Sequence, residues 1–164
     1  MKRKIILVVL MFFCFVLQST LFKQFAVASI TPNLLLILTV SFGFMRGKRE
    51  GLWVGFFCGL LMDLSMGELL GVNALIYMCI GYVNGFFWHI FYDDDIRIPI
   101  FFVTLSDLSY GIATYLILFL LRGRLNFFYY LRRIMIPEVL YTLILTILLY
   151  RLFYKINRWL EKAE

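Results

Sequence analysis

The chain has 164 residues, enough for one domain, and 63% of them are hydrophobic (AVILMFWYC) while only 16% are charged. Soluble domains are about 45–50% apolar, and a soluble fold of this size has too little polar surface to cover so much apolar area, so a soluble globular protein is excluded. The net charge of +6 comes from Lys and Arg at the ends of apolar runs, which is typical of an oriented membrane protein that touches anionic lipid and not of a nucleic-acid-binding protein.

Six apolar segments follow one another along the chain, and each is a candidate for a helix that crosses the membrane, which needs about 20 mostly apolar residues. They lie at about residues 5–22, 33–45, 51–64, 70–91, 100–121 and 134–153. We therefore predict a single integral membrane domain over residues 1–164, an all-α protein with about six transmembrane helices in one bundle. The second and third segments are shorter than a full span, so we expect them to form an inner pair within the bundle.

Basic residues or prolines mark the starts of the first, second and sixth segments. The first segment follows the basic cluster Lys2-Arg3-Lys4 and so resembles a signal peptide, but it has no small-x-small cleavage site. We expect it to remain in place as the first helix. Proline is favoured in the first turn of a helix, and Pro32 and Pro137 stand near the starts of the second and sixth segments.

The distribution of Lys and Arg predicts the orientation, because the cytoplasmic loops of membrane proteins carry more of these residues. If the amino terminus is cytoplasmic, eleven of the sixteen basic residues fall on the cytoplasmic side: Lys2, Arg3, Lys4, Arg46, Lys48, Arg49, Arg97, Arg151, Lys155, Arg158 and Lys162. The other five fall outside: Lys23, Arg122, Arg124, Arg132 and Arg133. We therefore expect both termini in the cytoplasm. The arginine-rich segment 122–134 is the exception. It could be an amphipathic piece on the outer surface, and we favour contact of its arginines with lipid phosphates over a protein-docking role.

A run of small residues with a four-residue step crosses the second and third segments and reaches the fourth: Gly43, Gly47, Gly51, Gly55, Gly59, then Asp63, Gly67 and Gly71. Because a helix turns once in 3.6 residues, members of this run within one helix share a face. Gly81 and Gly85 repeat the spacing in the fourth segment. Small residues let membrane helices approach closely. We predict that Gly51, Gly55, Gly59, Gly71, Gly81 and Gly85 form helix-packing faces within the chain, and that Asp63 points toward protein.

Several polar residues lie inside the apolar segments, and we predict that Asn73, Asp107, Glu138 and Thr142 are buried. Charged residues at membrane depth are costly and usually face the bundle interior or a cavity. These groups are expected to meet as a hydrogen-bonded network, to line a substrate pocket or to form an ion path, and the residues leave these alternatives open.

No set of residues has the spacing of a catalytic or metal site, so we predict that the protein is not an enzyme and needs no cofactor. The three adjacent aspartates at residues 93–95 seldom converge on one cation, and a solvated turn is expected there. The three cysteines lie inside apolar runs without CxxC spacing, and we expect them to be small buried hydrophobes: Cys14, Cys58 and Cys79.

Four stretches and one proline carry a resemblance to a known family: residues 32–36, 55–63, 70–75 and 81–85, and Pro137. On these features the chain is similar to the MreD family of rod shape-determining proteins, and the similarity covers essentially the whole chain in length and hydrophobic layout. The resemblance implies a multi-pass protein of the bacterial inner membrane. It also implies a non-catalytic component of the cell-elongation (rod) complex that helps regulate peptidoglycan synthesis and cell shape.

The partners that the resemblance implies are an MreC-like membrane protein and, through it, an elongation transpeptidase, a RodA-like glycosyltransferase and an MreB-like filament. The family's helical arrangement also resembles the substrate-binding subunit of energy-coupling factor transporters. That likeness supplies an alternative function, a small-molecule-binding membrane subunit of such a transporter. In this alternative Asp107, Asn73 and Glu138 would lie near the pocket.

Overall fold

The computed structural model describes residues 1–21, 24, 32–66, 70–92, 96–123 and 126–162, and this part of the chain is helical with no strand. The long helices are α1 (Lys2–Val16), α3 (Leu34–Arg46), α4 (Lys48–Met66), α5 (Val72–Phe86), α6 (Arg97–Arg122) and α8 (Ile136–Lys162). Shorter elements extend three of them: η1 (Leu17–Leu21), a π-helical turn after α1; η2 (Phe87–Tyr92), a 3-10 helix after α5; and α7 (Phe127–Tyr130) with the π-helical turn η3 (Leu131–Met135) before α8. The predicted all-α architecture is confirmed.

Within the described residues, three helices are long and apolar enough to cross a membrane: Lys2–Thr20, Arg97–Ile117 and Phe127–Lys162. Helix α3 is also apolar but has only 13 residues. The long helices expose large apolar side chains, such as Phe12, Leu116 and Leu148, on their outer faces. Water would penalise such surfaces, whereas lipid does not. The protein is therefore a membrane protein, as predicted.

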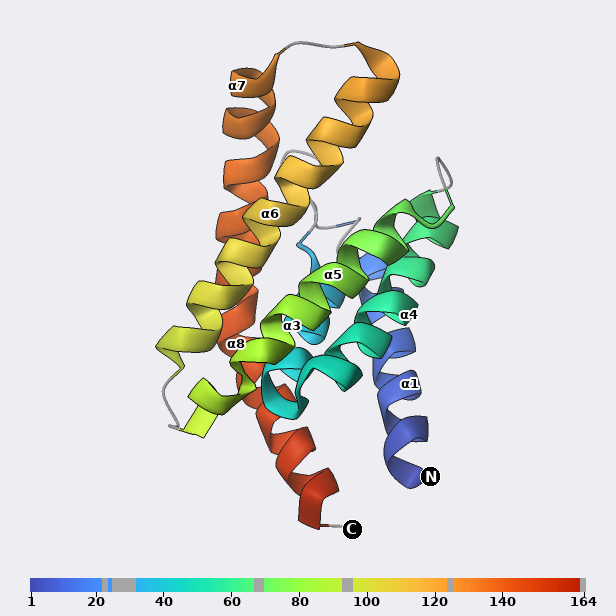
Figure 1. Ribbon diagram of the computed structural model, residues 1–164, viewed down its shortest axis with the longest axis vertical. Coiled ribbons are helices and arrows are strands. Elements are labelled where there is room, and N and C mark those ends of the chain that lie inside the picture. Colours follow the sequence, from blue (N-terminus) through green and yellow to red (C-terminus); the bar gives the residue numbers. More distant parts are fainter. Residues whose placement is uncertain (22–23, 25–31, 67–69, 93–95, 124–125, 163–164) are drawn as a thin grey trace.

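Helix α3 lies at the centre of the bundle, and each residue from Leu34 to Met45 is buried. Helices α4 and α5 lie side by side and pack on α3, while α1, α6 and α8 contact it from its other sides (Figure 1). The expected inner pair is correct for α3 but wrong for α4. One face of α4 packs against α5, and its opposite face exposes Trp53 and Phe57.

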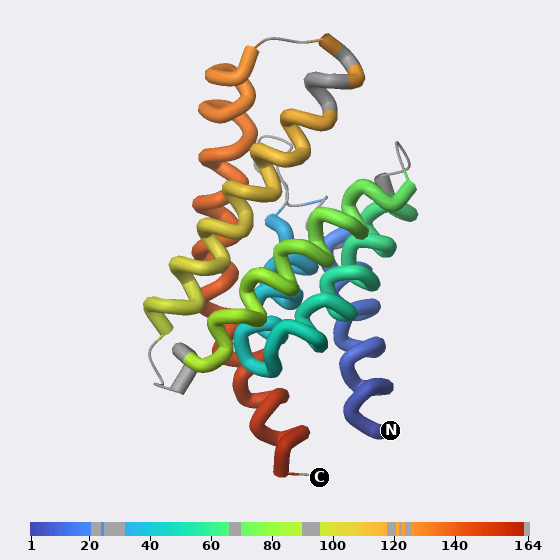
Figure 2. Tube along the Cα trace, viewed as in Figure 1, coloured from blue at the N-terminus to red at the C-terminus, as the bar shows by residue number. Residues whose placement is uncertain are grey.

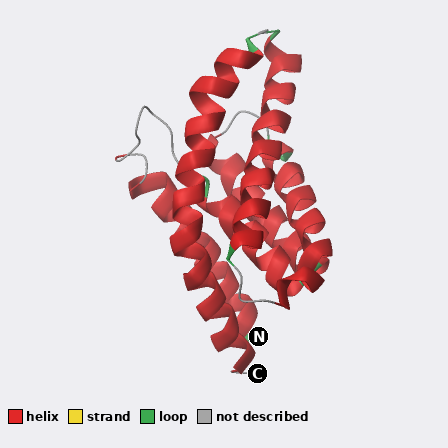
Figure 3. Ribbon diagram, turned by 90° about the vertical axis from the view of Figure 1, so that its left-hand side faces the viewer, coloured by secondary structure: helices red, strands yellow, loops and turns green. Residues whose placement is uncertain are grey.

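Both chain termini lie at the same end of the molecule (Figures 1 and 2). The end of α6 and the start of α7 lie at the opposite end, and a view turned by 90° shows the same placement (Figure 3). The α6 helix and the continuous α7–η3–α8 rod stand side by side and reach farther from the termini than α3, α4 and α5 (Figure 1). This arrangement places the helix ends of the bundle in two groups, one at each end.

Residues 127–134 belong to the continuous last rod and do not form a separate surface piece, so that part of the expectation is wrong. Helix α6 continues to Arg122, and the last rod begins at Phe127. Arg132 and Arg133 are exposed on this rod, and Arg133 donates a hydrogen bond to the Tyr129 hydroxyl at 2.6 Å. The sequence was misleading because Arg132 and Arg133 interrupt the apolar run without interrupting the helix. Lys23, Gly67, residues 93–95 and Arg124, also named in the sequence expectations, lie outside the described residues.

Pro137 does not begin the last helix either, since it lies inside the continuous rod, two residues after the end of η3 at Met135. A proline within a helix removes one backbone donor, and its ring clashes with the carbonyl four residues earlier. A π-helical turn widens the backbone locally and is a known way to accommodate such a disturbance. The turn at η3 thus lets the helix pass through Pro137 instead of starting there.

Candidate functional site

The predicted glycine faces meet between α4 and α5 and reach α3. A Cβ added at Gly55 would lie 2.7 Å from the Tyr77 carbonyl carbon, and one added at Gly59 would lie 2.6 Å from the Ala74 nitrogen. Real Cβ atoms essentially never come within 3.0 Å of a heavy atom from another part of the chain, so a side chain at either position would force the two backbones apart. We call this contact the glycine seam, and its members are Gly43, Gly51, Gly55, Gly59, Gly81 and Gly85.

Two further glycines shape the connections at the ends of the seam. Gly47 is the single residue between α3 and α4, and its φ of 98° is a conformation that side chains rarely adopt. Gly71 has the same φ of 98° and stands at the amino-terminal cap of α5. A Cβ at Gly71 would meet no atom within 4 Å, so its role is conformational and it takes no part in close helix contact.

Asp63 lies near the carboxyl end of α4 and caps the amino terminus of α5. Its carboxylate accepts hydrogen bonds from the backbone N–H groups of Gly71 at 2.9 Å, Asn73 at 3.1 Å and Ala74 at 3.1 Å. The first N–H groups of a helix have no partner within the helix, and a carboxylate there also interacts favourably with the helix dipole. Asp63 is only 2% exposed, so it joins the two seam helices inside the protein.

A chain of polar side chains crosses the bundle from α8 to α6. The Asn33 side chain caps α3 by accepting from Leu36 N–H at 3.3 Å, and it also accepts from the Tyr77 hydroxyl at 2.5 Å. The Asn33 backbone N–H donates to the Thr142 hydroxyl at 3.4 Å. The Tyr77 ring packs edge-on against Tyr110 with 5.3 Å between ring centroids.

The predicted polar residues join this central polar chain to different extents. Asn73 accepts a hydrogen bond from the Tyr110 hydroxyl at 3.0 Å, and Thr142 is the contact of Asn33 on α8. Asp107 lies one turn before Tyr110 on α6 and is 3% exposed. Glu138 lies one turn before Thr142 on α8 and is partly buried. The structure thus brings Asn73 and Thr142 into one network and places the two acids beside it.

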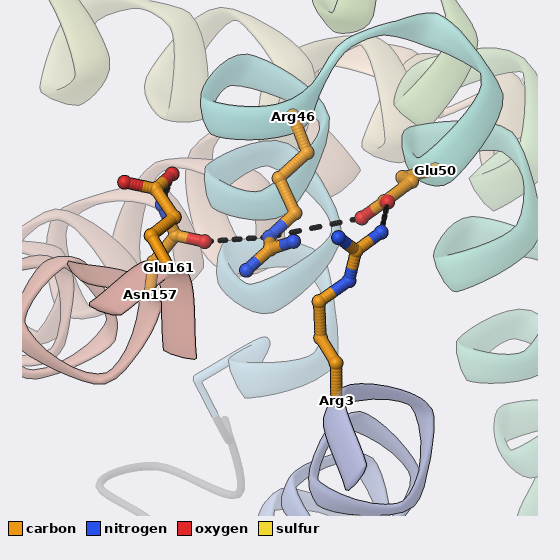
Figure 4. Close-up of polar contacts among 5 residues, drawn as sticks. All are labelled: Arg3, Arg46, Glu50, Asn157 and Glu161. Carbon is orange, nitrogen blue, oxygen red and sulfur yellow. Dashed lines mark hydrogen bonds and ion pairs between the residues drawn. The ribbon is translucent and has the colours of Figure 1, made fainter. Parts of the chain in front are cut away.

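A second polar group, at the end where the termini lie, joins four helices (Figure 4). Glu50 of α4 forms an ion pair with Arg3 of α1 and lies 3.7 Å from the Arg46 Nε of α3. Arg46 donates to the Asn157 side-chain oxygen of α8 at 2.5 Å, and Asn157 donates in turn to Glu161 at 3.1 Å. We call these five residues the basal cluster.

Sequence reasoning missed both Asn33 and the basal cluster as structural units. Asn33 had a usable signal, because Asn is a preferred residue at the amino-terminal cap of a helix. Arg46 was counted as one of the basic residues that orient the chain, yet its side chain is only 7% exposed. Arg3 and Glu50 are 47 positions apart in the chain, and no local pattern relates them.

Cys79 also differs from its expectation, because it is exposed while Cys14 and Cys58 are buried. It faces a hollow of about 350 Å³ between α5 and α6, on whose lining the buried side chains of Asn84 and Ser106 are hydrogen-bonded at 2.9 Å. Within the described part of the chain, no three His, Cys, Asp or Glu side chains group in a way that would hold a metal ion. The polar groups of the central chain and of the basal cluster connect helices to one another.

The sequence matches the family described as rod shape-determining protein MreD over residues 2–160. No curated protein and no solved structure matches the chain.

Proposed function

Because this match covers nearly the whole chain, the protein belongs to the MreD family of rod shape-determining membrane proteins, and we propose that it is a non-catalytic scaffold of the cell-elongation complex. In this role it binds the membrane anchor of an MreC-like partner and so influences peptidoglycan synthesis. It does so in a bacterial inner membrane, with both termini in the cytoplasm. The family match over residues 2–160 is the observation that carries the proposal.

The way the helices are joined supports a scaffold. The glycine seam joins α4 to α5 through backbone contacts, and the basal cluster links α1, α3, α4 and α8. Backbone contacts have little freedom to adjust, since protein interiors transmit strain instead of absorbing it. A bundle held in this way presents the outer faces of α1 and α8 in a fixed geometry, which suits recognition of another membrane helix.

Co-purification from membranes in a mild detergent tests the partner. The tagged protein is expected to retain a co-expressed MreC-like protein, and to lose it when the membrane anchor of that partner is replaced by an unrelated membrane helix. An unrelated single-span protein expressed to the same level is the control for non-specific retention. If the MreC-like protein does not associate, or associates equally well with the replaced anchor, the proposed contact is wrong.

Depletion tests the cellular role separately. We expect rod-shaped cells to become round as the protein is lost, and rods to return when the wild-type chain is supplied again. Unchanged rods after complete depletion would contradict the role in a cell in which no second copy of the gene is present.

The family match gives no support to the alternative, a small-molecule-binding transporter subunit. The likeness to the substrate-binding subunit of energy-coupling factor transporters therefore stays a prediction from sequence. It has its own test, since such a subunit purifies with a tightly bound small molecule that mass spectrometry detects after release.

A further inference from the structure

A groove of about 320 Å³ runs between α1 and α4, beginning at the basal cluster. Its polar end is formed by Arg3, Lys4 and Glu50. Beyond that end the lining is apolar, with three residues from α1 and three from α4: Leu7, Val8, Met11, Trp53, Val54 and Phe57. A groove with one charged end and apolar walls fits an amphipathic ligand.

The two walls have matching lengths. From Lys4 to Met11 on α1, and from Glu50 to Phe57 on α4, the helix advances seven residues, or about 10 Å at 1.5 Å per residue. One leaflet of the hydrocarbon core is about 15 Å thick, half of the full core. The groove therefore spans most of the depth that one lipid acyl chain occupies, with its charged end at one membrane surface.

The charged end is positive. Glu50 already faces two arginines, Arg3 and Arg46, so its negative charge is compensated within the basal cluster. Lys4 lines the groove and is exposed. Lys2 is exposed as well, but it does not line the groove. Lys2 and Lys4 are separated by two positions, which on a helix turns their side chains about 200° away from each other. A positive end beside an apolar channel complements a phosphate attached to an acyl chain.

We propose that this groove binds one anionic glycerophospholipid, with Lys4 holding its phosphate and one acyl chain lying between α1 and α4. Trp53, which is 59% exposed and part of the apolar wall, lies against the part of that acyl chain nearest the phosphate. The bound lipid fills the space between two helices that are otherwise joined at this end through the pair of Arg3 and Glu50. The site depends on the chain lying in a membrane and not on the identity of its protein partner.

Quenching of Trp53 fluorescence tests the site. Trp88→Phe and Trp159→Phe leave Trp53 as the only tryptophan, and the protein is reconstituted in phosphatidylcholine vesicles with a small fraction of brominated lipid. Brominated phosphatidylglycerol is compared with brominated phosphatidylcholine at equal fraction. Each basic residue near a membrane surface favours anionic lipid by about 1 kcal/mol. We therefore expect phosphatidylglycerol to quench Trp53 at about one fifth of the concentration that phosphatidylcholine requires.

The variants Lys4→Gln and Lys2→Gln separate a specific site from general attraction, because both remove one positive charge from the same helix. Lys4→Gln is expected to abolish the preference for phosphatidylglycerol, and Lys2→Gln to leave it unchanged. Equal loss in both variants would show diffuse attraction to the surface, and no loss in either would show that Lys4 does not hold the phosphate. If neither lipid quenches Trp53, another helix fills the groove. Each of these three results overturns the proposal.

Discussion

The glycine seam makes a sharp prediction for the smallest possible change, Gly55→Ala. The added Cβ would lie 2.7 Å from the Tyr77 carbonyl carbon and closer still to its oxygen, whereas an ordinary contact is 3.4 Å or more. The two helices must therefore separate by at least 0.7 Å, the difference between these two distances. Forcing extra atoms into a packed interior costs about 1–3 kcal/mol. We expect the upper end of this range, because the atoms in the way belong to a backbone that cannot change rotamer.

The helix propensity of the new residue acts in the opposite direction. Alanine favours a helix over glycine by about 1 kcal/mol, so the net loss expected for Gly55→Ala is about 2 kcal/mol, the difference between about 3 and about 1. Thermal melting in detergent, followed by loss of the monodisperse peak in size-exclusion chromatography, measures the effect. The melting temperature is expected to fall clearly below that of the parent protein.

Gly111→Ala is the matched control for this experiment. A Cβ at Gly111 would also come within 2.8 Å of an atom, but that atom is the terminal methyl of Met135, a flexible side chain that can move. We expect this variant to melt at the same temperature as the parent or slightly above it. If Gly55→Ala and Gly111→Ala melt alike, the seam is not a close backbone contact and the reasoning is wrong.

Three other predictions concern buried polar groups and are measured by the same melting assay. Asp63→Asn keeps an acceptor for the α5 cap and is expected to cost about 1 kcal/mol of stability. Asp63→Leu leaves three backbone N–H groups without their acceptor and is expected to cost about 3 kcal/mol. Equal melting temperatures for the two variants would show that the cap is unimportant. Arg46→Gln removes a charge from a buried cluster and is expected to cost about 3 kcal/mol of stability. Arg3→Gln, at a side chain 30% exposed, should cost less than about 1 kcal/mol. A larger loss of stability for Arg3→Gln than for Arg46→Gln would contradict this description of the basal cluster. Tyr77→Phe removes one of two donors to the Asn33 side chain and should cost about 1 kcal/mol of stability. Asn33→Leu also removes the cap of α3 and should cost about 2 kcal/mol or more. A smaller loss of stability for Asn33→Leu than for Tyr77→Phe would refute this prediction.

Much of the secondary structure follows from the sequence, because lipid requires each spanning segment to satisfy its own backbone hydrogen bonds. Apolar runs of sufficient length are therefore helices, and the three longest candidate spans correspond to the first, fifth and sixth predicted segments. The errors lie at the helix ends. Helix α4 begins at Lys48, inside the expected basic turn, and the last rod begins at Phe127, before the expected start at residue 134. Charged residues end an apolar run, but near the membrane surface a helix continues through them, because their long side chains reach the polar headgroups.

The candidate site is less accessible to such reasoning. The four-residue glycine spacing identifies a face that permits close approach, but not which helix will approach it. The structure pairs that face of α4 with α5, the next helix in the chain. Asn33 and Thr142 are 109 positions apart, and so distant a hydrogen bond leaves no local pattern.

The sequence by itself determined that this protein is an all-α membrane protein of the MreD family, since composition, apolar run length and family similarity are properties of the chain read in order. Only the tertiary structure decided which helix is central. Helices α3 and α4 both looked short and inward-facing, yet α3 is buried on all sides while α4 exposes Trp53 and Phe57 to the surroundings. The physical reason is that lipid and protein interior are equally apolar, so hydrophobicity does not distinguish a buried helix face from a lipid-facing one. Close packing and paired polar groups make that distinction, and both require partners from distant parts of the chain.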